Sequence, residues 1–415
     1  MEQTALLRTL FDTAVKTADP MVCVPRHLPP KPDGKLLVIG AGKASARMGE
    51  ALESVWGPCD GMIITRYGYE RPLQGITLKS ASHPVPDEAG LLATRGLRAL
   101  LEKADHTTFI LALISGGGSS LMIDPAGDMT LAEKQAVNAA LLASGAPIDE
   151  MNVVRKHLSR IKGGQLAAAS FPATLHALMI SDVPGDDPAF IASGPTVGDR
   201  STIADALAII ERYEIDLPAS AQTVLKGPSG VIAPGDERLS RTTNTIIAAP
   251  SQSLDAAKLI AEGEGIAVTI LGDAIEGEAR DLATEQAALA LKMQSEITSP
   301  HLLLSGGECT VTRTGNGVGG PNAEYALSLA IALNGQKGIH AIACDTDGVD
   351  GAAEVAGALV TPETLAKAQA ANIDPQASLA NNDAHSFFAS LDDQVITGPT
   401  LTNVNDFRAI LIEPI

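Results

Sequence analysis

Residues 109–120 read Phe-Ile-Leu-Ala-Leu-Ile-Ser-Gly-Gly-Gly-Ser-Ser, a short apolar run that stops abruptly in serine and glycine. The run has the length and composition of a buried strand. Glycine lets the following turn adopt a positive φ and lets a ligand approach the backbone amides, and the serine hydroxyls add hydrogen-bond donors. The stretch therefore predicts a buried strand whose carboxyl end opens into a ligand-binding loop.

Two further apolar runs end in the same way. Residues 36–39 lead into Gly40-Ala41-Gly42-Lys43 at the start of a helical pattern, and residues 302–304 lead into Ser305-Gly306-Gly307-Glu308. Free amides at the start of a helix favour an anion such as phosphate. One such turn can be purely structural, but three in one chain favour a protein that binds phosphorylated ligands. The predicted nucleotide-binding residues in these turns are Gly40, Gly42, Gly116, Gly117, Gly118, Ser119, Ser120, Gly306 and Gly307.

Around these turns, strand-like apolar runs alternate with amphipathic helical patterns, and a segment rich in proline and glycine interrupts them at residues 217–244. Alternation of this kind is typical of βαβ units with a mainly parallel sheet. A chain of 415 residues also favours two domains. We therefore expect two α/β domains: residues 1–225, with a Rossmann-like parallel sheet covered by helices on both faces, and residues 240–415. Because ligands bind at the carboxyl ends of strands in such sheets, we expect the active site in the cleft between the domains.

The composition argues against several classes of function. A net charge of −19 lacks the basic footprint that nucleic acid requires, and no apolar run is long enough to cross a membrane. The first residues lack the basic start of a secretory signal, so we expect a cytoplasmic protein with small-molecule partners. Its four cysteines are widely spaced and form no CxxC pair, which predicts buried, reduced thiols.

One segment of this acidic chain is basic. Arg155-Lys156-His157 is followed closely by Arg160 and Lys162, and the segment ends in Gly163-Gly164. A solvated helix face would explain such a cluster in a neutral chain. In a chain with this excess of acidic residues, we favour an anion-binding site.

Lys43 occupies an unusual position for a lysine. It lies at the first turn of a predicted helix, where the helix dipole is already positive. A bound anion such as a transferring phosphoryl group would offset this conflict, although a lysine that reaches into solvent is the simpler alternative. Lys43 is therefore a candidate catalytic residue.

Several carboxylates follow predicted strands. Asp182 comes directly after one apolar run, Asp347 after another, and Glu308 ends the third glycine turn. The spacing around Asp347 does not match an EF-hand, but hard carboxylates beside phosphate are what Mg²⁺ needs. Helix and turn capping is the alternative. We predict Asp182, Glu308 and Asp347 as metal ligands, with Asp182 also as a catalytic base, and the sequence leaves open which of them binds Mg²⁺.

The first glycine turn also permits a dehydrogenase. It meets the GxGxxG pattern only as Gly40, Gly42 and Ser45, and Arg66 stands where an acidic ribose-binding residue is expected. Because an arginine at this position can bind the 2′-phosphate of NADP, Arg66 is compatible with a dehydrogenase, and this alternative stays open. It leaves the other two glycine loops unexplained.

Taken together, the motifs resemble the class II glycerate kinases, the glycerate 2-kinase family whose C-terminal part is the MOFRL domain. The resemblance implies ATP-dependent phosphorylation of D-glycerate at the C2 hydroxyl, giving 2-phosphoglycerate and ADP, with Mg²⁺ and with Lys43 as the catalytic lysine. Members have also been labelled hydroxypyruvate reductases, so NAD(P)H-dependent reduction of hydroxypyruvate to glycerate is the alternative. The motifs that carry the resemblance are residues 40–44, 83–88, 113–121, 152–164, 181–185, 193–196, 304–308, 345–351 and 397–406.

The proposed acceptor gives the basic segment a role. Glycerate carries a carboxylate next to C2, and a site that phosphorylates C2 must hold this charge away from the γ-phosphate. We therefore predict Arg155, Lys156 and Arg160 as substrate-binding residues.

One motif departs from the family. Where the family usually reads Gly-Gly-Arg-Asn-Gln-Glu, this chain has Gly319-Gly320-Pro321-Asn322-Ala323-Glu324. The resemblance implies nucleotide binding by Gly319, Gly320 and Asn322. Loss of the arginine can cost several orders of magnitude in rate unless another cation replaces it. The sequence leaves open which cation that is, whether the acceptor has shifted to another small hydroxy acid, and whether the protein forms a homodimer.

Overall fold

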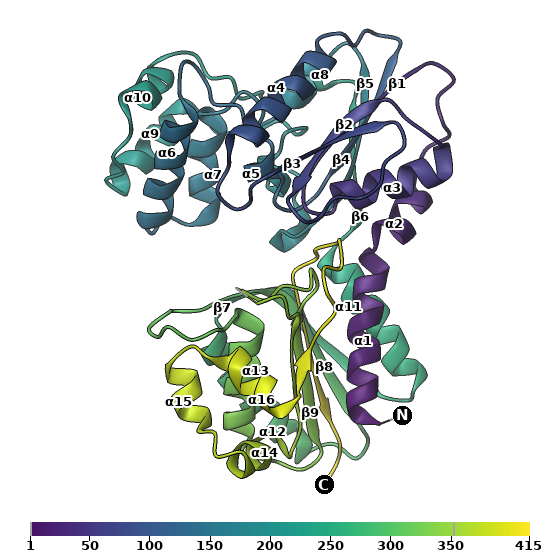
Figure 1. Cartoon of the computed structure of the whole chain (residues 1–415), viewed down its shortest axis with the longest axis vertical. Helices are drawn as coiled ribbons and strands as arrows, with labels where there is room; N and C mark the ends of the chain where they lie inside the picture. The colour runs from purple at the N-terminus through teal and green to yellow at the C-terminus, as the bar shows by residue number, and fades with distance from the viewer. Residues whose placement is uncertain (1, 352) are drawn as a thin grey trace. The chain divides into compact units, whose positions relative to one another are not determined.

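The computed structural model describes residues 2–351 and 353–415, which divide into two compact units (Figure 1). The N-terminal unit consists of Pro20–Ser181 and Asp186–Ile247, and the C-terminal unit of Ala248–Ile415 with Asp182–Gly185 and the first helix, α1 (Gln3–Ala18). The predicted α/β fold of both parts is confirmed. The domain bounds at residues 225 and 240 and the placement of the active site in a cleft remain predictions.

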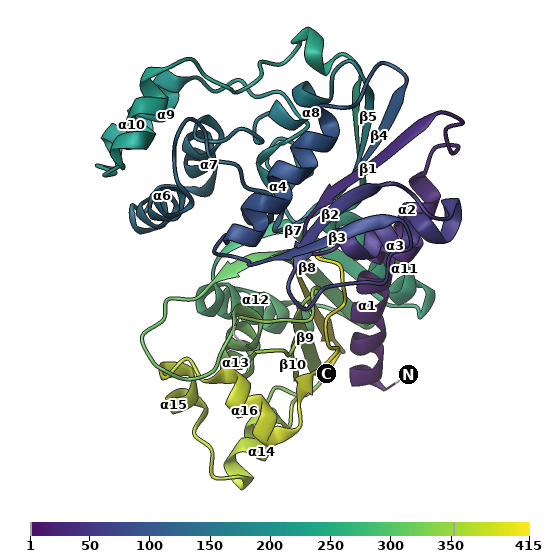
Figure 2. The same ribbon diagram turned by 45° about the horizontal axis from the view of Figure 1, so that its top comes forward.

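A six-stranded sheet forms the centre of the N-terminal unit, in the order β3-β2-β1-β4-β5-β6. The strands from β3 to β5 are parallel, as predicted, and this order is typical of Rossmann folds. Helices α3 and α4 lie on opposite faces of the sheet (Figure 2), so the central strands are buried on both sides. The strands are β1 (Lys35–Ala41), β2 (Gly61–Arg66), β3 (Ile76–Ala81), β4 (Thr108–Ile114), β5 (Thr174–Ile180) and β6 (Thr242–Ala248). The surrounding helices are α2 (Pro20–His27), α3 (Ser45–Trp56), α4 (Glu88–Leu101), α5 (Gly118–Leu121) and α8 (Gln165–Ser170), with 3₁₀ turns at Pro184–Asp186, Ile191–Ser193 and Glu237–Leu239.

Four further helices of this unit pack around a core of their own. They are α6 (Leu131–Ala143), α7 (Ile148–His157), α9 (Ile203–Arg212) and α10 (Ala219–Lys226). Val137 and Leu141 of α6 and Val154 of α7 are fully buried in this core. Helix α6 begins with a capping box formed by Thr130 and Glu133, which fixes the start of the helix. This helical layer forms one wall of the pocket described below.

The C-terminal sheet has the order β11-β10-β9-β12-β8-β7 and is mixed. Strands β7 and β8 are parallel, whereas the last strand of the chain, β12, inserts antiparallel between β8 and β9. Strand β10 follows β9 without an intervening helix, which allows antiparallel pairing. The predicted α/β fold holds for this unit: β7 and β8 are parallel and are joined through α12 (Ala279–Gln294) as a βαβ unit. The sheet is mixed because β10 and β12 pair antiparallel with their neighbours. The strands are β7 (Ala267–Glu278), β8 (His301–Thr310), β9 (Ile339–Asp345), β10 (Gly357–Val360), β11 (Gln394–Val395) and β12 (Asp406–Ile412).

Helices cover both faces of this second sheet (Figure 1). Helices α1 and α11 pack on the face that presents Leu302 and Leu304, and α12 and α13 on the face that presents Leu303. This alternation is the two-residue period of a strand buried on both faces. Helix α1 belongs to this unit because Leu7, Leu10 and the rest of its apolar stripe are buried here. The helices are α11 (Pro250–Gly263), α12 (Ala279–Gln294), α13 (Pro321–Leu333), α14 (Thr364–Ala370), α15 (Pro375–Ala380) and α16 (Ala384–Leu391).

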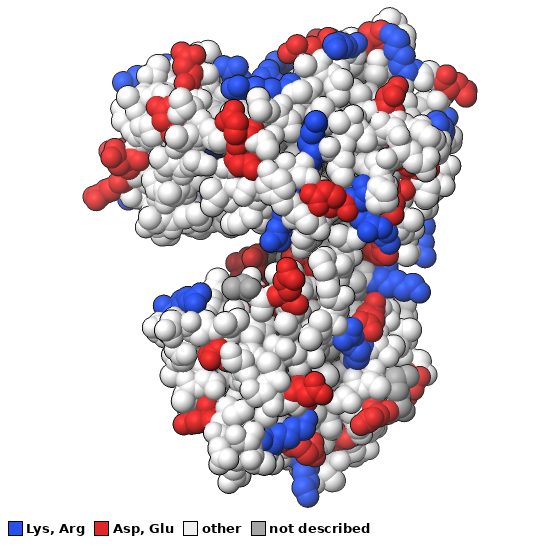
Figure 3. Space-filling view, viewed as in Figure 1, with Lys and Arg blue, Asp and Glu red and all other residues white. Residues whose placement is uncertain are grey.

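The structure also allows the expectations from composition, on cysteines, membrane spans and charge, to be compared with the fold. All four cysteines are buried, as predicted, and none of them forms a disulfide within the described residues. Every helix within the described ranges is too short or too polar to cross a membrane. On the face shown in Figure 3, acidic and basic side chains are interspersed over both units.

Candidate active site

The glycine loop after β4 brings together groups from three segments. The amide of Lys43 donates a hydrogen bond of 2.9 Å to the carbonyl oxygen of Gly116. Gly117 has a φ of +78°, and a Cβ atom there would lie 3.0 Å from the His83 ring and 3.2 Å from Cγ of Lys43. Glycine at 117 is thus needed for its conformation and for the approach of both side chains. The amides of Gly116 and Gly117 have no acceptor among the described residues, so they are available to an anion.

The first glycine turn, in contrast, uses its amides within the protein. Gly42 donates to the carbonyl oxygen of Ile64 at 3.2 Å, and Ala44 donates to the hydroxyl oxygen of Ser115 at 3.0 Å. A Cβ atom on Gly40 would lie 2.7 Å from a carbonyl oxygen of β4, so this glycine permits close packing of the strands. A nucleotide-binding role for Gly40 and Gly42 therefore stays a prediction, and both glycines have a structural reason to be present.

A pocket of about 680 Å³ opens beside the loop, within the N-terminal unit. Its walls come from residues 83–86, from the glycine loop with Ser119 and Ser120, and from α6 and α7. Three exposed apolar side chains, Val85, Leu142 and Ile148, form what we call the apolar rim. No aspartate or glutamate occurs among the described residues that line the pocket.

Three cations form what we call the cationic floor of this pocket: Lys134, Arg155 and Lys162. Lys134 is 2% exposed, and its Nζ atom has no hydrogen-bond partner in the described part of the chain. Burial, with a smaller contribution from the charge of Arg155, lowers the pKa of Lys134 to about 7. The floor therefore brings together basic side chains without a compensating carboxylate among the described lining residues.

Lys162 connects the cationic floor to the glycine loop. Its Nζ atom donates to the carbonyl oxygen of Ser119 at 2.6 Å and to the hydroxyl oxygen of Ser119 at 2.7 Å. That hydroxyl also lies 2.8 Å from the hydroxyl of Ser193. Burial, together with the nearby charge of Lys134, lowers the pKa of Lys162 well below its usual value. Lys162 thus holds the loop in place beside the pocket.

The three predicted substrate-binding residues separate in the structure. Arg155 lines the pocket, and its Nε atom has no partner among the described residues. Lys156 instead pairs with Asp199 at 2.5 Å, and Arg160 donates to the carbonyl oxygen of Gly127 at 2.7 Å beside a second pocket. Only Arg155 lies at the glycine loop, so the substrate-binding roles of Lys156 and Arg160 remain predictions.

The glycines before α13 pack against a buried carboxylate. Asp350 accepts the amides of Asn322 and of the residue after it, both at 2.9 Å, and so caps α13. The side-chain amide of Asn322 donates to Asp406 at 2.7 Å. Cβ atoms on Gly319 and Gly320 would lie 2.7 Å from a carbonyl oxygen and 2.4 Å from the carboxyl group of Asp350, respectively. Nucleotide binding by these residues stays a prediction, because their present contacts are structural.

Gly306 and Gly307 lie inside β8. A Cβ atom on Gly307, which has a φ of +125°, would lie 2.2 Å from the carbonyl oxygen of Ile275 on β7. A Cβ atom on Gly306 would lie 3.2 Å from a carbonyl oxygen of β12. Close packing between strands thus explains both glycines, and their nucleotide-binding role stays a prediction.

The three predicted metal ligands lie in the C-terminal unit but form no cluster. Glu308 is exposed on β8, and Asp347 is buried and accepts the amide of Val349 at 2.8 Å. Asp182 follows β5 after one intervening residue and is half-buried. Among the residues described, no three side chains of histidine, cysteine, aspartate or glutamate come together as a metal site. These residues remain predicted ligands for a Mg²⁺ ion that needs only one or two of them.

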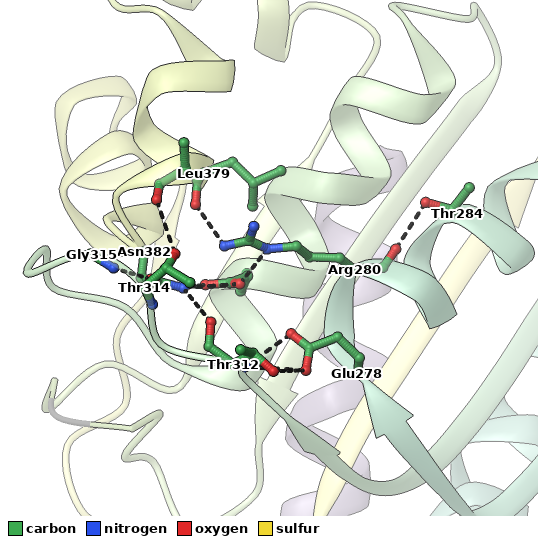
Figure 4. A network of polar contacts seen from close by, with 10 residues as sticks. Glu278, Arg280, Thr284, Thr312, Thr314, Gly315, Leu379 and Asn382 are labelled. Carbon is green, nitrogen blue, oxygen red and sulfur yellow. Dashed lines mark hydrogen bonds and ion pairs between the residues drawn. The ribbon is translucent and has the colours of Figure 1, made fainter.

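A polar network fixes the segment between β8 and α13, as Figure 4 shows. Arg280 donates to the fully buried Glu324 at 2.6 Å, and Asn382 donates to the same carboxylate at 3.0 Å. The Asn382 carbonyl oxygen accepts the amides of Thr314 and Gly315, each at 2.8 Å. This network positions the segment that leads to the Gly-Gly-Pro motif.

Two residues of the pocket, His83 and Lys134, are absent from the predicted site residues, whereas Lys162 belongs to the basic segment for which an anion site is predicted. His83 belongs to the motif at residues 83–88, in which Asp87 accepts the amide of Gly90 at 2.9 Å and caps α4. A signal for Lys134 exists in the sequence. It lies on the same helical stripe as the buried Val137, an unexpected position for a lysine.

Comparison with known proteins agrees with this architecture. Residues 6–226 match the model of a domain of unknown function, DUF4147, and residues 301–406 match the MOFRL family. A protein of Agrobacterium vitis named "putative hydroxypyruvate reductase" is 51% identical over 98% of this chain and 94% of its own length. The D-glycerate 2-kinase of Thermotoga maritima is 37% identical over 96% of each chain. The crystal structure of a Thermotoga maritima glycerate kinase superposes with a TM-score of 0.90 at 36% identity, over 98% of this chain and 99% of that one. Shared architecture and sequence over almost the whole length mean that the chain belongs to the glycerate 2-kinase family.

Proposed function

We propose that the protein transfers the γ-phosphoryl group of ATP to the C2 hydroxyl of D-glycerate and releases 2-phosphoglycerate and ADP. The observation that carries this proposal is the presence of two adjoining groups of basic side chains and available amides in the N-terminal unit. One consists of Lys43 and the amides of Gly116 and Gly117, and the other is the cationic floor. The reaction has two anions to bind, the triphosphate and the acceptor carboxylate.

Each group has a chemical task in this proposal. Lys43 stabilises the charge that spreads over the γ-phosphoryl oxygens and the leaving group in a loose transition state. Arg155 binds the acceptor carboxylate, because its guanidinium can form two parallel hydrogen bonds with a carboxylate. Asp182 accepts the proton of the C2 hydroxyl, a task that contributes about 10²–10⁴-fold in rate.

Mg²⁺ belongs to the same proposal. Asp182, Glu308 and Asp347 are the residues that would hold it, and the dispersed carboxylates suit an ion that takes most of its ligands from phosphate and water. When bound, Mg²⁺ neutralises charge on the phosphate oxygens.

A second candidate function is NAD(P)H-dependent reduction of hydroxypyruvate. The name of the Agrobacterium vitis relative favours it, as does the Rossmann order of the first sheet. The amides of Gly42 and Ala44 oppose it, because a dinucleotide pyrophosphate would need donors that here bind the protein.

One assay separates the two functions. The purified protein is incubated with ATP, Mg²⁺ and D-glycerate, and in parallel with NADPH and hydroxypyruvate. We expect ADP in the first reaction, with a product that enolase consumes directly, since enolase acts on 2-phosphoglycerate. Oxidation of NADPH without ADP formation would refute the kinase and support the reductase. Lys43→Met serves as the control against a contaminating kinase.

A further inference from the structure

Burial of Lys134 at its position is energetically unfavourable. An ammonium group at 2% exposure with no hydrogen-bond partner loses its hydration without compensation. Its neighbours Val137 and Leu141 on the same helical stripe are fully buried and apolar, so methionine or leucine would pack there at no such cost. A structural explanation for this lysine is therefore lacking.

The surroundings of Lys134 favour an anion. The other titratable or charged groups that line the pocket are His83, Arg155 and Lys162, and among the described lining residues none is acidic. The apolar rim reduces the local dielectric, which strengthens an ion pair formed inside the pocket. A ligand with a negative charge would thus provide the partner that Lys134 lacks.

We propose that Lys134 is a substrate-binding residue whose ammonium group, with Arg155 and Lys162, binds the carboxylate of the acceptor. The assignment rests on the proposed function, which supplies the carboxylate. It goes beyond that function because it makes an unpartnered lysine of α6, together with Lys162, responsible for acceptor specificity.

The acceptor fits this floor better than the nucleotide does. The triphosphate already has Lys43 and the available amides of Gly116 and Gly117. A carboxylate brings one negative charge, which can receive hydrogen bonds from Lys134 and Arg155 together. Separate binding of the two anions also keeps the carboxylate away from the transferring phosphoryl group.

The test compares Lys134→Met and Lys134→Gln with the wild type and with Lys103→Met, a control at an exposed lysine just after α4. Steady-state kinetics give the KM for D-glycerate and for ATP, and calorimetry gives the binding of D-glycerate in the absence of nucleotide. We expect both variants to raise the KM for D-glycerate about 10- to 100-fold, as for one hydrogen bond between charged groups. The KM for ATP should change less than about threefold.

The possible results of this test distinguish failure of the Lys134 assignment from failure of the proposed function. An unchanged KM and affinity for D-glycerate in folded variants would overturn the assignment, and so would an increase confined to the KM for ATP. Two variants are used because Gln keeps a polar group if Met disturbs the pocket. If the wild type shows no kinase activity, the proposed function fails, whereas calorimetry with D-glycerate still decides whether Lys134 binds it.

Discussion

Replacement of Lys134 should stabilise the free protein and change how its stability depends on pH. Lys134 has a pKa of about 7 in the folded protein, because burial disfavours the ammonium form, whereas the ordinary pKa of a lysine side chain is 10.5. Between these values the unfolded chain binds a proton that the folded protein does not. The wild type therefore gains stability as the pH rises from 7 towards 10, and it carries the full penalty below pH 7.

The magnitude follows from the size of this gap. A difference from 10.5 to about 7 corresponds to a penalty on the order of 5 kcal/mol at about 1.4 kcal/mol per pH unit. Lys134→Met lacks this penalty. We therefore expect the variant to be several kcal/mol more stable than the wild type at pH 7, and this advantage should shrink by about 1.4 kcal/mol per unit as the pH approaches 10.

Urea unfolding at pH 7, 8, 9 and 10 measures this effect. The single tryptophan, Trp56, lies in α3, so its fluorescence follows the N-terminal unit that contains Lys134. The charge of Lys134 also lowers the pKa of Lys162, so the difference between variant and wild type reports the titration of Lys134 together with its effect on Lys162. A difference that is independent of pH, or a variant that is less stable at pH 7, would refute the reasoning.

Three further predictions concern single side chains. Lys43→Met should lower kcat on the order of 10³-fold with thermal stability close to that of the wild type; a folded variant that keeps more than about a tenth of its kcat would show that another group carries the charge. Asp182→Asn should lower kcat about 10²–10⁴-fold while circular dichroism stays unchanged, and wild-type turnover would remove Asp182 from the site. Lys156→Met should destabilise the protein, by up to about 3–5 kcal/mol in urea, because Asp199 loses its ion-pair partner and keeps only the hydrogen bonds from Ser201.

The sequence predicts the fold well because its signals are local. Apolar runs that end in glycine mark strands such as β1 and β4, and both form as predicted with a parallel partner. The strand directions of the C-terminal sheet are not predicted from the sequence. They depend on where β12 inserts, and this is decided by contacts between segments that are distant in the sequence. No residue within β12 itself signals the direction of its neighbours.

The candidate site is predicted less completely, for a similar reason. Glycine is needed wherever a chain approaches another closely, so sequence alone does not separate Gly117, which faces the pocket, from Gly307, which packs against β7. In the same way, a cluster of basic residues in the sequence does not reveal which of their side chains line the same pocket. Arg155 and Lys156 are adjacent in sequence, yet one lines the pocket and the other pairs with Asp199. Lys134 lies outside that cluster and joins the pocket only through the packing of α6 and α7.

Pro321 gives a last prediction, because it stands where the family usually carries an arginine. It is the first residue of α13, a position where proline costs nothing since its missing amide would have no helical partner. Pro321→Arg should therefore lower the stability by no more than about 1 kcal/mol. If phosphoryl transfer uses a cation there, the substitution should raise kcat at least about tenfold and leave the KM for D-glycerate unchanged, since a charge that acts in the transition state affects turnover. Pro321→Gln, measured in the same assay, controls for the loss of proline. An equal kcat in the Arg and Gln variants would mean that this chain has its charge stabilisation elsewhere, with Lys43 as the first residue to examine.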